Sequence, residues 1–167
     1  PYLVTTDIFW EIFAAAYEGL FILKEKQQAM PAFWEFIKAA EENLLQNMPD
    51  SRWMHVFSVV SALKKGTSTD EAEKAELLRI EKEEGREVSP RLNMMVDYAE
   101  LKPRGHYTSS EDMKTYFKAF KYLTGMAGNS LEPDDPARMR VEELSRLSPE
   151  VKDKAKKWIA AYDAFIT

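Results

Sequence analysis

The stretch IFWEIFAAAYEGLFIL, residues 8–23, is the most apolar part of the sequence and organises our interpretation of the fold. Apolar side chains surround most of the helix that it would form, which is the pattern of a buried helix. It is shorter than the ~20 residues that a membrane span needs, and Glu11 and Glu18 interrupt it. Because Asp7 supplies a capping side chain, we expect a central core helix over residues 7–28 and no membrane span.

Helical spacing of apolar residues predicts that other helices pack on this one. The clearest stripe runs from Met113 to Ala127, and residues 33–44 and 53–63 carry similar stripes. A further helix, after residue 71, is mostly charged, so we expect it on the surface. The expected helix starts and stops are Pro31, Ser68-x-x-Glu71, Thr108-x-x-Glu111, Asp134-Asp135-Pro136, Ser148-Pro149, and the glycines Gly66, Gly85 and Gly128.

One long segment, residues 86–107, has no helical period and contains Pro90, Pro103 and Gly105, which favour turns. Its apolar residues predict ordered packing, and we find no alternation typical of a strand. The sequence therefore predicts an all-α fold in which residues 1–167 form a single helical domain or sub-domain. We expect an irregular bundle of about seven helices around the central apolar helix, with one long ordered loop.

Composition narrows the functional classes. The net charge is −5, with 23 basic and 28 acidic residues, so we expect no nucleic-acid partner. The absence of cysteine excludes disulfides and thiolate zinc sites, and two histidines without HExxH spacing lead us to expect no metal and no cofactor. Glu132, Asp134 and Asp135 lack the order and the glycine of a calcium-binding loop, so we interpret them as a helix-capping acidic loop.

The two ends of the sequence suggest a fragment. The chain begins at Pro1, enters an apolar helix almost at once without a basic leader, and ends on the apolar residues 164–167. We therefore expect a piece of a longer protein, and the rest of that chain is the first candidate partner.

The most unusual run is Lys102-Pro103-Arg104-Gly105-His106-Tyr107-Thr108, which leads directly into a predicted helix start. Free N–H groups and the positive end of the helix dipole favour an anion at such a place, and Lys102, Arg104 and His106 add positive charge. The functional interpretation is a carboxylate or phosphate site that includes Tyr107 and Thr108. The simpler alternative, which we favour, is that Arg104 pairs with an internal carboxylate and His106 bonds to backbone.

Acidic residues of the expected core helix offer partners to this loop. Asp7, Glu11 and Glu18 stand close to one face of that helix. Burying a lone carboxylate is costly, so these side chains need partners. We therefore predict that Arg104 or His106 approaches Asp7 or Glu11.

Two stretches carry a family resemblance. They are DYxxLKPRGHYT at residues 97–108, followed by YFKA at residues 116–119, and the opening VTTD at residues 4–7. They resemble the bacterial domain-of-unknown-function family three-one-six-zero. The resemblance implies a longer protein, often an exported lipoprotein or another cell-envelope protein, and it implies no transferable activity. That family often has histidines in the first helix, where this chain has Glu11 and Ala14, so a histidine-rich metal site does not carry over.

The leading hypothesis is an envelope-associated binding or structural module that takes a small anion or a glycan at residues 102–108, beside Asp7 and Glu11. Without export, the cytoplasm is the expected location. The alternative is a hydrolase of glycans or another envelope polymer, with helix-one acids in acid–base roles and Arg104 and His106 orienting substrate. Glu11 and Glu18 would stand about 10.5 Å apart along the helix axis, beyond the about 9.5 Å of inverting glycosidases.

The residues leave open whether the protein is an enzyme. A third hypothesis makes the loop a clasp that ties helices together. Removal of Arg104 from a buried pair would then cost about 3–5 kcal/mol.

Overall fold

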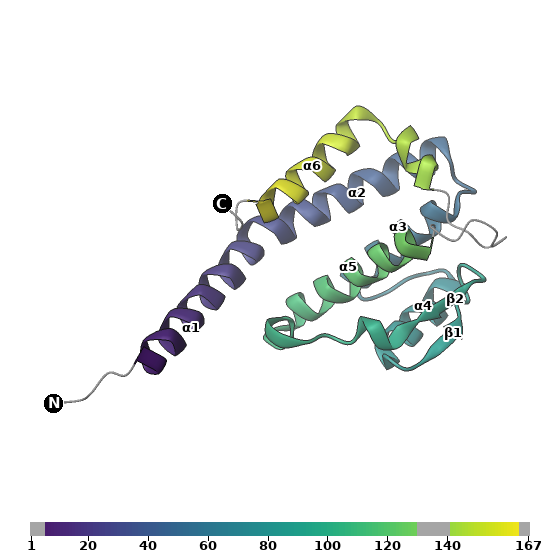
Figure 1. The fold of residues 1–167 in the computed structure, drawn as a ribbon. Coiled ribbons are helices and arrows are strands. Elements are labelled where there is room, and N and C mark those ends of the chain that lie inside the picture. The colour runs from purple at the N-terminus through teal and green to yellow at the C-terminus, as the bar shows by residue number, and fades with distance from the viewer. Residues whose placement is uncertain (1–5, 130–140, 164–167) are drawn as a thin grey trace.

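The structure is a computed structural model that describes residues 6–129 and 141–163. Its longest feature is one continuous helical rod (Figure 1). α1 (Thr6–Lys24) passes through a π-helical turn (Glu25–Ala29) into α2 (Met30–Asn47), and the residues at both junctions keep right-handed helical angles. Pro31 was expected to begin a separate helix. It lacks one helical N–H and crowds the carbonyl a turn earlier, and the π turn lies immediately before it.

The predicted central position of the first helix is wrong. α1 projects from the body of the molecule (Figure 1), and residues 14–20 are all exposed. Leu20, for example, is 66% exposed, and burial begins only around Phe21. Apolar composition shows that a helix favours burial, but it does not show which element covers it.

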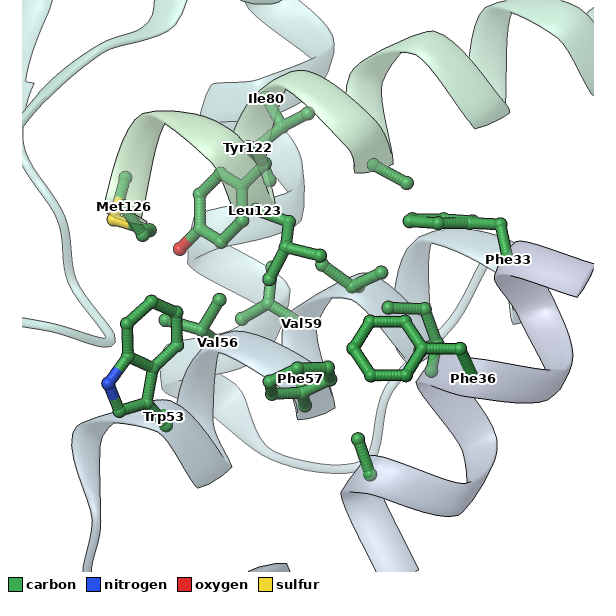
Figure 2. Close-up of a cluster of buried hydrophobic side chains, with 14 of the residues drawn as sticks. Phe33, Phe36, Trp53, Val56, Phe57, Val59, Ile80, Tyr122, Leu123 and Met126 are labelled. Carbon is green, nitrogen blue, oxygen red and sulfur yellow. The ribbon is translucent and has the colours of Figure 1, made fainter. Parts of the chain in front are cut away.

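The central helix is instead α2. It packs on α6 (Pro149–Asp163) and on α3 (Arg52–Lys65), and α3 packs in turn on α5 (Glu111–Asn129) and α4 (Glu71–Lys82). A short 3₁₀ helix (Val141–Arg146) precedes α6. The apolar stripes predicted for these helices meet in one core (Figure 2), whose members include Phe33, Ile37, Leu44, Val56, Phe57, Val60, Met113, Tyr116 and Leu123.

The predicted helix boundaries are partly confirmed. Gly66 ends α3 with φ 71°, and the Ser148 hydroxyl accepts from Val151 N at 3.4 Å at the start of α6. Both capping boxes were placed two residues early, because Asp70 and Ser110 accept from the helix N–H groups of Glu73 and Met113 at 2.8 and 3.4 Å.

Two helix ends differ from the expected positions. α4 ends at Lys82, before Gly85, and Glu83 takes the left-handed conformation. α5 continues through Gly128 to Asn129. The expected start at residues 134–136 and the acidic loop around it lie outside the described residues.

The predicted loop at residues 86–107 is ordered but is not irregular throughout. β1 (Arg86–Val88) and β2 (Met95–Asp97) form an antiparallel hairpin, with Glu87 opposite Val96. The all-α prediction holds broadly, because the fold is mostly helical and these two strands are short. Strands of three residues are too short to show alternation in a sequence. Two 3₁₀ helices follow, Tyr98–Leu101 and Gly105–Thr108.

Among the described residues, no helix is both long enough and apolar enough to cross a membrane.

Candidate functional site

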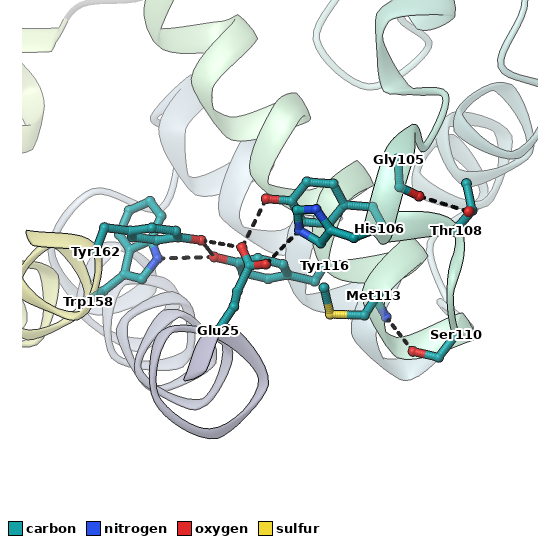
Figure 3. Close-up of polar contacts among 10 residues, drawn as sticks. Glu25, Gly105, His106, Thr108, Ser110, Met113, Tyr116, Trp158 and Tyr162 are labelled. Atoms are coloured by element: carbon teal, nitrogen blue, oxygen red, sulfur yellow. Dashed lines mark hydrogen bonds and ion pairs between the residues drawn. The ribbon is translucent and has the colours of Figure 1, made fainter. Parts of the chain in front are cut away.

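A buried carboxylate, Glu25, anchors the segment of residues 102–108, which the sequence analysis identified as a candidate site (Figure 3). Glu25 lies in the π-helical turn and is 0% exposed. Its Oε2 lies 2.9 Å from His106 Nε2, and its Oε1 accepts hydrogen bonds from the hydroxyls of Tyr107 and Tyr162, each at 2.9 Å. A buried carboxylate needs such donors, because it has lost its hydration. We call Glu25, His106, Tyr107 and Tyr162 the Glu25 cluster.

Aromatic side chains extend this cluster. Tyr116 and Tyr162 are hydrogen-bonded through their hydroxyls, and Trp158 Nε1 donates to the Tyr116 hydroxyl at 3.4 Å. Burial, followed by the negative charge of Glu25, raises the pKa of the Tyr107 hydroxyl, and burial also raises the pKa of Tyr116 and Tyr162. These tyrosines therefore stay protonated at neutral pH and remain hydrogen-bond donors.

The predicted contact between the loop and helix one is made at a different acid. His106 meets Glu25, whereas Arg104 lies 3.7 Å from Glu100 in an exposed pair. Glu11 is exposed on α1, and the Asp7 side chain lies outside the described residues. Glu25 was missed although it follows Glu18 by seven residues, two helical turns along the same face.

Lys102 and Thr108 lie at a second place, an open groove of about 790 Å³. The groove runs between the C-terminal end of α3, α4, residues 102–108 and the first half of α5. We call it the lysine groove, because its lining includes Lys74, Lys102, Lys114 and Lys118, together with Leu63, Leu77, Leu78, Pro103, Thr108, Glu81, Glu83 and Glu111.

The lysines of the groove differ in their partners. Lys118 is 7% exposed and its ammonium lies 2.8 Å from Glu81 and 3.0 Å from Glu83. Burial alone would lower the pKa of Lys118, but the hydrogen bonds to these two carboxylates outweigh it and raise the pKa. Within the described residues, Lys102 is exposed and has no ion-pair partner.

The helix start at which the sequence predicted an anion carries acidic side chains. Thr108 lies in the 3₁₀ helix, where its hydroxyl donates to Gly105 O at 2.8 Å, and α5 begins only at Glu111. Glu111 and Asp112 already place negative charge in the first turn of α5. The three cations of the segment therefore have different surroundings: His106 contacts Glu25, Arg104 lies beside Glu100, and Lys102 lines the groove.

In the part of the chain that the structure describes, no group of three or more metal-ligating side chains could hold an ion. The Glu132, Asp134 and Asp135 loop lies outside that part.

Comparison with known proteins gives a family and no further relative. Searches of curated proteins and of solved structures found no match. A family model described as a protein of unknown function, DUF3160, matches residues 1–166. It is the family that the sequence around residues 97–108 resembles. The chain therefore belongs to the DUF3160 family.

Proposed function

We propose that this protein is a binding module and that its ligand, a small molecule with an anionic group, docks in the lysine groove. The observation that carries the proposal is the two-sided placement of residues 102–108. One side of this short segment is anchored on Glu25 through His106 and Tyr107, and the other side presents Lys102 and Thr108 to the groove.

The anchoring matters for binding because it fixes the groove wall before a ligand arrives. Tyr107 also packs against Phe117 of α5, with ring centroids 4.9 Å apart. A rigid wall reduces the ordering cost of association. The volume of about 790 Å³ lies within the range of small-molecule sites.

Binding is better supported than hydrolysis. Acid–base catalysis needs a carboxyl group that is free to exchange a proton beside the substrate. Glu81 and Glu83 of the groove both bind the Lys118 ammonium, and Glu11 and Glu18 are exposed on the projecting α1. This arrangement favours a module that holds its ligand.

The cell-envelope location remains part of the proposal and rests on the family resemblance. The test is fractionation of cells that make the full-length protein, with a cytoplasmic and an envelope marker. Recovery with the cytoplasmic marker would contradict it.

Thermal melting with phosphate, acetate and a uronic-acid oligosaccharide tests the binding proposal. At least one of these anions should raise the melting temperature of the wild type, and Lys102→Gln should lose that rise. Lys157→Gln removes an exposed lysine of α6, outside the groove lining, and serves as the matched control. A rise that is equal in all three proteins would overturn the assignment of the site.

A further inference from the structure

The lining of the lysine groove includes an exposed leucine. Leu78 of α4 is 65% exposed. It lines the groove with Leu63, Leu77 and Pro103, all of them half-buried. Single exposed leucines are ordinary, but an apolar strip inside a concave site is a candidate ligand contact.

The charges at the rim of the groove can be used by a ligand. Lys74 pairs with Glu71 at 2.6 Å and Lys114 pairs with Glu111 at 2.7 Å, and the glutamates of both pairs are strongly exposed. Exposed pairs of this kind contribute little and exchange readily. Lys102 has no such partner among the described residues, so it is the first cation that a ligand would meet.

The acids of the groove restrict the ligand further. Glu81, Glu83 and Glu111 lie among the four lysines. Four lysines against three glutamates give the lining a small excess of positive charge, and Lys102 is a lysine without an ion-pair partner among the described residues. A polyanion would bring several of its charges close to these carboxylates, and like charges repel. A ligand with a single anionic group fits this pattern better.

Building on the proposed function, we infer that the natural ligand is a small amphipathic anion. Its carboxylate or phosphate binds Lys102, with Lys74 or Lys114 nearby, and its hydrocarbon part lies on Leu63, Leu77, Leu78 and Pro103. A purely polar anion would use only the lysines of the groove, and a neutral apolar ligand would use only its leucines and proline.

Calorimetry with acetate, butanoate, octanoate and octanol tests this inference. Each fully buried methylene strengthens binding about fourfold, so partial burial should make octanoate at least about tenfold tighter than butanoate. Octanol has the same chain without the charge and should bind more weakly than octanoate. Lys102→Gln should weaken octanoate several-fold and leave octanol unchanged.

Leu78→Gln tests the apolar contact separately. It should weaken octanoate several-fold, because the other three apolar residues remain, and should change butanoate less. Because Leu78 is exposed, the variant should keep its melting temperature. Leu45→Gln removes a leucine of α2 that is 59% exposed and lies outside the groove lining, and it should leave octanoate affinity unchanged.

The outcomes separate the two proposals. Acids that bind through Lys102 with no dependence on chain length would overturn the amphipathic ligand and leave anion binding in place. Absence of binding by phosphate and by every acid would overturn the proposed function as well. Binding to phosphatidylglycerol vesicles without binding to free octanoate would also overturn the inference, because the site would then bind a membrane surface and not a free small molecule.

Discussion

Glu25 and Glu76 are both fully buried, and each accepts hydrogen bonds from two tyrosine hydroxyls. Glu76 binds Tyr98 and Tyr122 at 2.7 and 3.0 Å and Ser89 Oγ at 2.5 Å. Its donors lie 13–46 residues away in the sequence, whereas the donors to Glu25 lie 81–137 residues away. Glu76 thus holds neighbouring elements together, and Glu25 joins the long rod to residues 105–108 and to α6.

The two carboxylates also differ in the kind of donor. The side-chain donors to Glu76 are hydroxyl groups, and burial raises the pKa of both Tyr98 and Tyr122, so these groups stay neutral. The Glu25 cluster contains the imidazole of His106, which is partly exposed. Glu76 is therefore enclosed on all sides, while water can reach the Glu25 cluster through the partly exposed His106.

Removal of Glu76 should have the largest effect on stability. Glu76→Ala leaves three buried hydroxyl donors without an acceptor and should lower the free energy of unfolding by about 3–5 kcal/mol. Urea denaturation measures it, with the exposed Glu42→Ala as the control. A loss below about 1 kcal/mol would show that Glu76 does not stabilise this part of the core.

Removal of Glu25 should cost less. Glu25→Ala also strands His106, Tyr107 and Tyr162, but water can reach the partly exposed His106, so we expect about 2–4 kcal/mol. A double-mutant cycle with His106→Gln isolates the contribution of the pair. A loss larger than that of Glu76→Ala would break the comparison, because it would mean that the joint between distant segments is the more enclosed of the two.

These two glutamates also show where sequence reasoning succeeds and fails. The stripes of α2, α3 and α5 were predicted because burial there follows apolar spacing. α4 was expected on the surface because most of its residues are charged. In the structure, Glu73, Glu76 and Ile80 face inward and Leu78 faces outward. A charged residue can point inward when distant hydroxyls satisfy it, and spacing alone does not reveal those partners.

The candidate site was found in part for a similar reason. The run at residues 102–108 stands out through its proline, glycine and cations, and its need for an acidic partner followed from the charges. Its division between Glu25 and the lysine groove depends on backbone angles within the segment, such as φ 56° at Gly105. The predicted central position of the apolar α1 was wrong, because periodicity indicates that a helix prefers burial but does not indicate which elements pack against it.

The second histidine, His55, lies outside the Glu25 cluster and has different surroundings. Burial, aided by the charge of Arg91, lowers the pKa of His55, whose surroundings also include Asp70, Asp50 and Glu73. The unfolded state therefore binds more protons than the folded state as the pH falls below about 6.5, and stability falls with it. Between pH 7.5 and pH 5, the melting temperature of His55→Gln should fall by fewer degrees than that of the wild type. An equal loss in both proteins would assign the acid sensitivity to other groups.

Arg104→Ala should have the smallest effect, although Arg104 lies two residues from His106. Its guanidinium is 3.7 Å from Glu100, and both side chains are more than half exposed, so the pair should contribute less than about 0.5 kcal/mol. The clasp hypothesis for Arg104 predicted about 3–5 kcal/mol, which applies only to a buried pair. Urea denaturation of Arg104→Ala and of His106→Ala, measured at the same pH, shows which of the two residues stabilises the fold. A loss near 3 kcal/mol for Arg104→Ala would mean that Arg104 has a buried partner, and a clear loss for His106→Ala alone would assign the clasp to His106 and Glu25.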